Sequence, residues 1–285
     1  MNIGLVTYED LPNLSPSDQG LIPLFAEQEI FAKPVVWNRT DVNWSRFDYL
    51  ILRSVWDSHL KSEGFSHWLS YLEAHDIKIF NPVSLVKYNL HKFYLRDLQE
   101  KGIDIIPTIF IPSSPSLDLD EVTARNWKQA VIKPAISAGS YLTERFFIHE
   151  LNLVQTKYQS ISKERDLLVQ EFIPEILDFG EISLVYFNRK FSHGVRKTPV
   201  NGDFRVQIQY GGIIVPFVPE QKLKEQAERI LSTFPGEILY GRVDGVMYKG
   251  KFLVMEVELI EPDLYFEFGE GSRKRLVDSF IEMTQ

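Results

Sequence analysis

Four charged side chains near the end of the chain carry the strongest chemical signal. In GRVDGVMYKGKFLVMEVELIEP, Glu256 and Glu258 are two residues apart on a predicted strand, and Arg242 and Asp244 share that spacing on the strand before it. Alternate residues of a strand face the same way. Two carboxylates on one face of an apolar strand repel each other and lose hydration, so a positive charge should lie between them. Such hard oxygen donors suit Mg²⁺; glutamates on an exposed sheet face are the alternative.

These two strands should form a hairpin around Lys249 and Gly250. A plain two-residue turn there would place Asp244 opposite Met255 and split the carboxylates between the two faces. A shared metal needs Asp244 opposite Glu256 instead. We therefore predict an odd loop or a bulge that sets this register, with Arg242 opposite Glu258.

A lysine inside an apolar strand is the second signal. Lys133 in VIKPAISAGS precedes a loop of small residues that includes Ser137, Gly139 and Ser140. Small residues let backbone N–H groups approach phosphate oxygens, and lysine adds a point charge. The pattern indicates a phosphate site; an edge-strand lysine before an ordinary turn is the alternative.

A third signal lies at the end of another apolar strand. It consists of a polar pair and an apolar pair before a proline: Gln170, Glu171, Phe172 and Ile173. Backbone groups at such a strand end can hydrogen-bond the edge of an adenine while an apolar side chain packs on its face. A partly exposed strand has the same pattern. Glu181, a few residues further on, could accept hydrogen bonds from ribose hydroxyls.

Arg205 in NGDFRVQIQYGG is the fourth signal, and we expect it in a strand between two glycine-bearing turns, with Lys197 and His193 upstream. A guanidinium there could stabilise the charge of a phosphoryl group during transfer. A surface pair with Asp203 is the alternative. We expect His193 to be structural, because no Ser/His/Asp set accompanies it.

The string RSVWDSH follows a predicted strand, YLILRS. Ligands bind beyond the carboxyl ends of strands in a parallel sheet. Arg53 could hold a small carboxylate bidentately, Asp57 could accept an ammonium, and Ser54 and Trp56 would complete the pocket. The sequence thus predicts an amino acid site; a structural arginine beside a helix N-cap is the alternative.

Alternating elements should position these residues. We expect strands at 2–8, 49–54 and 78–82, with helices at 21–30 and 65–75 between them, which predicts a βαβ unit with a parallel sheet. A helix over 87–102 and a Pro/Ser-rich passage then place a boundary near 85–110. Later segments predict antiparallel strands and helices at 220–233 and 273–284. The fold class is therefore α+β after an α/β start.

Composition limits the function classes. The 285 residues are 44% hydrophobic and 13% aromatic, which is ordinary globular usage. A net charge of −8 argues against a nucleic-acid partner. The absence of cysteine excludes a thiolate metal site and a cysteine nucleophile, and fits a reducing, cytoplasmic location. Neither a signal peptide nor a membrane-spanning apolar run is found, so we expect no membrane partner.

In chain order these pieces resemble the ATP-grasp superfamily, whose members join a carboxylate to an amine through an acyl-phosphate. NPVSLVKYNLHK is similar to the glutathione-synthetase-like segment that begins the ATP-binding region, and IKPAISAGS to the lysine strand and phosphate loop. GRVDGV and MEVELIEP resemble the metal strands of D-alanine:D-alanine ligases. LRSVWDSH, SAGSYLTER and LIEPDLYF are most like the subfamily of the ligase that closes the ring in D-cycloserine biosynthesis.

The resemblance implies a role for each candidate residue. ATP would be bound by Lys92, Lys133, Ser137, Gly139, Ser140, Gln170, Glu171, Phe172, Ile173 and Glu181. Asp244, Glu256 and Glu258 would hold Mg²⁺, and two ions are expected because Glu258 replaces the asparagine of many relatives. Arg205, Arg242 and Lys197 would be catalytic, and Arg53, Ser54, Trp56 and Asp57 would bind the substrate.

The resemblance also implies three domains: an α/β N-terminal domain over 1–85, a central lid domain over 86–180 and a C-terminal β-rich domain over 181–285. The expected function is an ATP- and Mg-dependent ligase that forms a linear or cyclic amide from an amino-acid-like small molecule. A phosphotransferase on the same fold and a non-catalytic nucleotide-binding module are the alternatives. The identity of the substrate and the existence of a homo-oligomer stay open.

Overall fold

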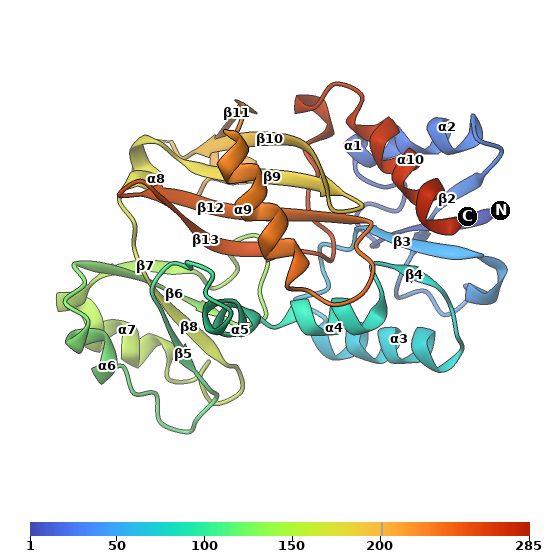
Figure 1. Ribbon diagram of the computed structural model, residues 1–285. Coiled ribbons are helices and arrows are strands. Elements are labelled where there is room, and N and C mark those ends of the chain that lie inside the picture. The colour runs from blue at the N-terminus through green and yellow to red at the C-terminus, as the bar shows by residue number, and fades with distance from the viewer. Residues whose placement is uncertain (201) are drawn as a thin grey trace.

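The computed structural model describes residues 1–200 and 202–285, and these residues form three sheets flanked by helices (Figure 1). The first sheet comprises β1 (Asn2–Thr7), β2 (Phe31–Val36), β3 (Tyr49–Ser54) and β4 (Ile79–Phe80) in the order β2-β1-β3-β4. All its strand pairs are parallel, which confirms the predicted sheet. The strand β2 was not predicted, and it contains Pro34. Proline is tolerated there because β2 is an edge strand.

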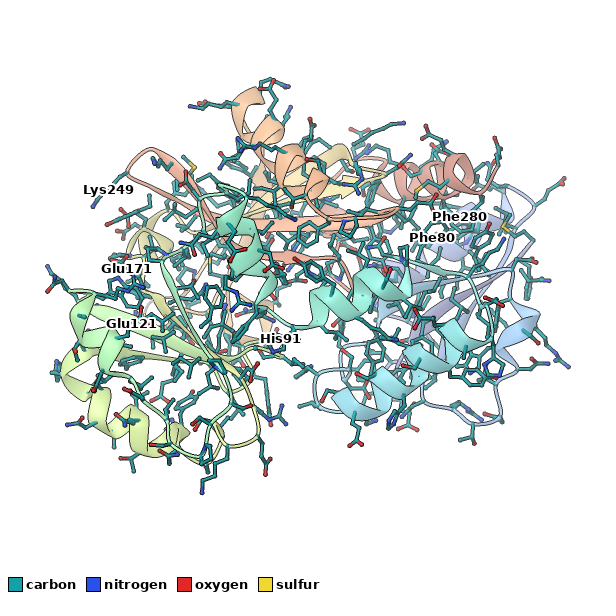
Figure 2. The ribbon with its side chains drawn as sticks, turned by 60° about the horizontal axis from the view of Figure 1, so that its bottom comes forward. Phe80, His91, Glu121, Glu171, Lys249 and Phe280 are labelled. Atoms are coloured by element: carbon teal, nitrogen blue, oxygen red, sulfur yellow. The ribbon has the colours of Figure 1, made fainter. Side chains whose placement is uncertain are left out.

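Helices cover both faces of this sheet: α1 (Pro16–Gln19), α2 (Leu21–Ala26), α3 (Ser62–Ala74) and, from the far end of the chain, α10 (Ser272–Thr284). Phe280 of α10 packs edge-on against Tyr49, with ring centroids 5.6 Å apart, and against Phe80 at 5.8 Å. Figure 2 shows Phe80 and Phe280 side by side at this end of the molecule. The two ends of the chain therefore share one core.

The helix expected over 87–102 is two helices, α4 (Val83–Leu90) and α5 (Tyr94–Glu100). At the break, His91 has an extended backbone, and the N–H of Lys92 donates to the carbonyl of Ala135 at 2.9 Å. The prediction of one helix was wrong because the apolar periodicity continues across the break. The break turns Lys92 toward the candidate site.

The middle sheet has the order β5-β8-β6-β7, and its strand pairs are antiparallel. It comprises β5 (Thr108–Ile111), β6 (Gln129–Pro134), β7 (Glu144–Phe147) and β8 (Leu167–Glu171), with α6 (Asp120–Ala124) and α7 (Leu151–Tyr158) against it. In β6, Ala130 and Ile132 are fully buried, whereas Lys133 faces a cavity. The period-two alternation of a strand thus separates the lysine from the core.

The last sheet has the order β11-β10-β9-β12-β13, all antiparallel. It comprises β9 (Glu181–Phe187), β10 (Lys190–Thr198), β11 (Ile213–Phe217), β12 (Tyr240–Tyr248) and β13 (Lys251–Glu258), with α8 (Glu175–Asp178) before it and α9 (Gln221–Ser232) against it. Arg205 lies between β10 and β11, outside any helix or strand, so the strand predicted for it was wrong. Each sheet falls within one of the ranges 1–85, 86–180 and 181–285, whose boundaries stay a prediction.

The predicted hairpin register is confirmed. Asp244 pairs with Glu256 and Arg242 with Glu258, and the register shifts just after Asp244. The turn itself has two residues, Lys249 and Gly250, both with positive φ, as a type I′ turn requires. The bulge therefore lies within the strands and not in the turn.

The bulge at Met255 decides which face carries the carboxylates. Before it, Val254 belongs to the core beneath α9; after it, Val257 belongs to the same core. Without the extra residue, Glu256 and Glu258 would share the face of Val254. With it, both side chains line the cavity.

Gly245 lies opposite the bulge, where a Cβ would be 2.4 Å from the backbone oxygen of Leu253. We predict that Gly245→Ala lowers the free energy of unfolding by about 1–3 kcal/mol, because backbone must move to make room. Gly64→Ala in α3 is the matched control, since its Cβ would meet only Trp37, at 3.7 Å. Urea denaturation of both variants tests this. Equal stability of the two would contradict the prediction.

Candidate functional site

A cavity of about 720 Å³ lies among the three sheets. Its wall contains all the predicted site residues except three: Trp56, Lys92, Lys133, Ser137, Gly139, Ser140, Gln170, Glu171, Phe172, Ile173, Glu181, Lys197, Arg205, Arg242, Asp244, Glu256 and Glu258. The three that do not line it are Arg53, Ser54 and Asp57. Residues as far apart in the sequence as Trp56 and Glu258 thus meet at one site.

Arg242 is the central cation of the acidic wall, and it is 5% exposed. Its Nε donates to Asp244 Oδ1 at 2.9 Å, and its guanidinium also pairs with Glu258. A further N–H donates to the carbonyl of Asp263 at 2.7 Å. The positive charge expected among the carboxylates is therefore supplied by the protein itself.

Two lysines neutralise the other carboxylates of this wall. Lys92, from the break between α4 and α5, lies 2.9 Å from Glu256 Oε1. Lys197 of β10 pairs with Glu181 and lies 3.8 Å from Asp244 Oδ2. Burial alone would lower the pKa of Lys197, but Asp244 and Glu181 raise it. A carboxylate of the acidic wall thus lies against each of these lysines.

The carboxylates respond differently to this environment. Burial is the largest single effect on Asp244 and Glu256 and opposes their ionisation. Arg242 and Lys197 together outweigh it at Asp244, and Lys92 and Lys133 together outweigh it at Glu256, so both pKa values are lowered. Burial raises the pKa of Glu258 to about 8; Arg242 opposes the shift, and Asp244 and Glu256 add to it. Of these three carboxyls, Glu258 is thus the one whose charge is least well compensated.

These carboxylates have the donor chemistry of a magnesium site, since they are hard oxygens on paired strands. As placed, however, they point at protein cations. Within residues 1–200 and 202–285, no group of three or more acidic or histidine side chains is gathered closely enough to hold a metal ion. Coordination would therefore require the carboxylates to exchange a protein cation for the ion.

Lys133 is the cation of the opposite wall, and no carboxylate among the described residues lies within ion-pair distance of its ammonium. Burial and the charge of Lys92 lower its pKa, while Glu256 opposes the shift. The following loop is held from two sides: Lys92 donates to the carbonyl of Ser137 at 2.5 Å, and Tyr210 donates to that of Gly139 at 3.3 Å. This wall offers a lysine and small residues to an anion.

The strand end at 170–173 forms the third side of the cavity. Gln170 is buried and donates to the hydroxyl of Thr108 at 3.0 Å. Phe172 is 5% exposed, and the guanidinium of Arg145 lies 4.9 Å from its ring centroid. All four residues of this strand end line the cavity, and a guanidinium lies over the ring of Phe172.

Arg205 lies at the rim of the cavity. Its guanidinium pairs with Asp203 at 2.7 Å and stacks on Tyr210 at 3.6 Å from the ring centroid. The surface pair given as the alternative does form, although Arg205 also lines the cavity. The stacking on Tyr210, which the sequence analysis missed, links Arg205 to the loop at Gly139.

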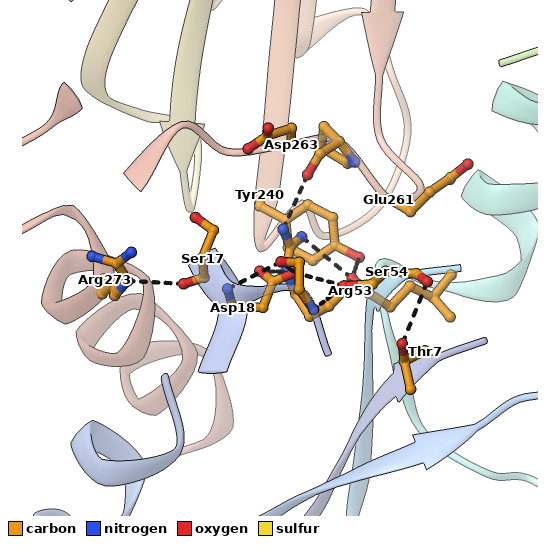
Figure 3. A network of polar contacts seen from close by, with 12 residues as sticks. Thr7, Ser17, Asp18, Arg53, Ser54, Tyr240, Glu261, Asp263 and Arg273 are labelled. Atoms are coloured by element: carbon orange, nitrogen blue, oxygen red, sulfur yellow. Dashed lines mark hydrogen bonds and ion pairs between the residues drawn. The ribbon is translucent and has the colours of Figure 1, made fainter. Parts of the chain in front are cut away.

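Arg53 is 1% exposed and lies behind the cavity wall. Its Nε donates to Asp18 at 2.9 Å and its Nη2 to the carbonyl of Pro262 at 3.0 Å, and its guanidinium lies 5.1 Å from the ring of Tyr240 (Figure 3). Ser54 also donates to Asp18, at 2.8 Å. The expectation that Arg53 grips a substrate carboxylate is not supported, because its donors are already occupied.

Asp57 also has protein partners. It accepts from Trp37 Nε1 at 2.8 Å and pairs with Lys61 at 2.8 Å. The expectation that it binds a substrate ammonium is therefore not supported either. Of the RSVWDSH residues named in that prediction, only Trp56 lines the cavity.

The segment 259–264, which follows β13, is irregular but fixed. Side chains from other elements donate to each of its carbonyls at 2.7–3.2 Å: Asn81 to Leu259, Tyr240 to Ile260, Trp56 to Glu261, Arg53 to Pro262, Arg242 to Asp263 and His193 to Leu264. The side chains of Glu261, Asp263 and Tyr265 line the cavity. Sequence reasoning assigned them no role, although the motif LIEPDLYF contains them.

The fold is the ATP-grasp fold of known ligases, and the solved structures bear this out. The D-alanine–D-alanine ligase from Bacillus anthracis, in complex with ATP, superposes with a TM-score of 0.71 at 16% identity, over 99% of this chain and 96% of that one. The ATP-grasp fold and the ligase class predicted from the sequence are confirmed by such similarities.

Within that class the chain is similar to D-cycloserine synthetase. A family model described as the N-terminal domain of D-cycloserine synthetase DcsG matches residues 3–81. The cycloserine biosynthesis protein DcsG of Streptomyces lavendulae is 25% identical over an alignment of 277 residues, with 89% of each chain covered. The crystal structure of D-cycloserine synthetase DcsG superposes with a TM-score of 0.90 at 24% identity and full coverage of both chains.

One further expectation concerned membranes. Within the described ranges, no helix has the length and apolar character needed to span a bilayer.

The raised pKa of Glu258 generates a prediction about stability. Between the unfolded carboxyl's pKa near 4.5 and the folded value of about 8, the folded protein holds a proton that the unfolded chain has lost. This proton's contribution to the free energy of unfolding therefore falls as pH rises, by at most about 1.4 kcal/mol per pH unit. We predict a flatter pH dependence for Glu258→Gln than for the wild type.

Urea denaturation between pH 5 and pH 8.5, in chelator and without nucleotide, measures that difference. Glu73→Gln is the control, because Glu73 lies on the exposed face of α3 and, among the described residues, has Lys87 as its one ion-pair partner. Its curve should run parallel to that of the wild type. Parallel curves for Glu258→Gln as well would refute the assignment.

Proposed function

We propose that this protein is an ATP- and magnesium-dependent carboxylate–amine ligase that acts on an amino-acid-like small molecule. One observation carries the proposal: a single cavity of about 720 Å³ joins Lys133 and its small-residue loop to Arg242 and the paired carboxylates. Opposite charges on facing walls suit a triphosphate together with a cation. The similarity to D-cycloserine synthetase and D-alanine–D-alanine ligase supports the same reading.

ATP would lie between the middle and the last sheet. Its adenine would contact the strand end at 170–173, and its phosphates would contact Lys92, Lys133 and the loop of Ser137, Gly139 and Ser140. Glu181 would accept from the ribose hydroxyls. This requires Glu181 to share or leave its partner Lys197.

Magnesium would be held by Asp244, Glu256 and Glu258. The extra negative charge of the third carboxylate favours two bound ions over one. When bound, magnesium would neutralise phosphate charge. The protein's own cations then become available: Arg242 and Lys92, which now pair with these carboxylates, would turn to the anionic groups. No covalent protein nucleophile is required.

The chain's own residues would act by position and charge. Arg242, Lys197 and Arg205 would stabilise the transferring phosphoryl group and the acyl-phosphate formed on the substrate carboxylate. The buried cavity would exclude water from that intermediate. An amine of the same molecule or of a second one would then displace phosphate, which gives a cyclic or a linear amide.

A screen of amino acids for stimulated phosphate release from ATP tests the function. A ligase should release phosphate and form an amide in equal amounts. Phosphate transfer to a hydroxyl, with no amide, would instead indicate a phosphotransferase. If ATP binds but none of the amino acids stimulates its turnover, the protein would be a nucleotide-binding module and the proposal would be overturned.

We predict that Glu256→Gln reduces turnover at least about 100-fold while the protein stays folded, because the carboxylate charge is lost and the shape is kept. Steady-state phosphate release and circular dichroism measure the two effects. Glu73→Gln is again a matched control, since it too removes a glutamate paired with a lysine at 2.8 Å, but far from the cavity. Normal turnover in Glu256→Gln, with unchanged magnesium dependence, would count against the metal assignment.

A further inference from the structure

Glu261 lacks the cationic partner that four other carboxylates of the acidic wall have. Glu181, Asp244, Glu256 and Glu258 each have a lysine or arginine partner. Among the described residues, no cationic side chain lies within ion-pair distance of Glu261. Its only side-chain hydrogen bond there comes from the Ser58 hydroxyl, at 3.4 Å. A carboxylate facing the cavity is thus left without a counter-charge.

Hydrogen bonds fix the backbone around Glu261, and this limits the directions in which its side chain can point. Its carbonyl accepts from Trp56, and the neighbouring carbonyls of Ile260 and Pro262 accept from Tyr240 and Arg53. Figure 3 shows the side chains of Glu261 and Asp263 directed to opposite sides of this segment. Glu261 therefore acts separately from Asp263, and it faces the loop that follows β3.

That loop supplies the rest of a polar pocket. Ser58 and His59 line the same cavity as Glu261 and Trp56, and the Ser58 hydroxyl is the group that contacts Glu261. The Nδ1 of His59 is buried and has no hydrogen-bond partner among the described residues. Burial and the charge of Lys92 lower the pKa of His59, so its ring is neutral at pH 7 and adds no repelling charge. A carboxylate, a hydroxyl and an imidazole thus line the same cavity.

The charge of this pocket favours a cationic ligand. Burial raises the pKa of Glu261 to about 7; Lys92 and Ser58 oppose the shift, and Glu256 adds to it. A bound cation would stabilise the ionised carboxylate and offset its desolvation. A metal ion does not fit, because one carboxylate and neutral neighbours give too few hard donors. A primary ammonium has three N–H donors and one charge, which matches this set.

We propose that Glu261 binds the ammonium group of the amine-bearing substrate, with Ser58 and His59 as neutral partners. The assignment of this amine to amide formation rests on the proposed function, whereas the binding itself does not. The position of Glu261 suits that role. The charges of Lys92 and Glu256, which lie on the proposed phosphate and metal side of the cavity, are close enough to shift its pKa. The subsite thus joins the first sheet's loop to the reacting centre.

Saturation-transfer NMR with methylammonium tests the binding without any turnover. Tetramethylammonium, which has the charge but no N–H donor, is the ligand control. We expect a methylammonium signal with the wild type, and affinity about 10-fold weaker in Glu261→Gln. Glu175→Gln should bind as the wild type does, because Glu175 is also partly buried but lies outside the cavity. No signal with the wild type, or equal affinity in Glu261→Gln, would overturn the proposal.

Kinetics with the amino acid that best stimulates phosphate release give the second readout. We expect Glu261→Gln to raise the KM for that amino acid by about 10- to 100-fold and to leave the KM for ATP within about twofold. A raised KM for ATP with an unchanged amino acid KM would overturn the proposal. Methylammonium binding that depends on Glu261, without any ATP turnover, would support the subsite and refute the proposed function.

Discussion

Buried carboxylates on the cavity face of β12 and β13 must be neutralised, and much of the molecule serves that need. An ion taken out of water costs several kcal/mol unless a partner repays it. Arg242 is shared by Asp244 and Glu258, and Lys92 lies against Glu256. These partners come from a neighbouring position on β12 and from the break between α4 and α5. Had those helices been continuous, the backbone of Lys92 could not bond Ala135, and its ammonium would not be held at this wall.

The parallel sheet contributes to the site mainly by holding the backbone of segment 259–264, which follows β13. Arg53, at the carboxyl end of β3, is held by Asp18 and in turn holds the carbonyl of Pro262. Tyr240 donates to the carbonyls of Leu52, Phe80 and Ile260. The carbonyls of segment 259–264 are thus hydrogen-bonded by side chains, although the segment is not part of a sheet. Side chains on fixed backbone lose less entropy when they bind a ligand.

Most of the strands and the acidic register were predictable from the sequence, because period-two patterns and a two-residue turn are local properties. The required pairing of Asp244 with Glu256 even demanded the bulge that the structure has. The helix break at Lys92 was not predictable, because it depends on a bond to distant Ala135. The position of Arg53 behind the cavity wall was not predictable for a similar reason. Its partner Asp18 is 35 residues away, and its sequence pattern also fits a ligand-binding arginine.

The internal ion pairs also bear on how ligands of the proposed kind would bind. Lys133 faces the cavity without a carboxylate, so a phosphate could approach it directly, whereas Lys92 is committed to Glu256. A phosphate that draws Lys92 away leaves Glu256 uncompensated, and a divalent cation at Glu256 releases Lys92. Each ligand therefore lowers the cost of binding the other, which is positive coupling between two sites that share one ion pair. The same exchange penalises either ligand alone, because it would leave a buried charge unpaired. A cavity built on such pairs thus favours the nucleotide and its metal together over free anions or free cations.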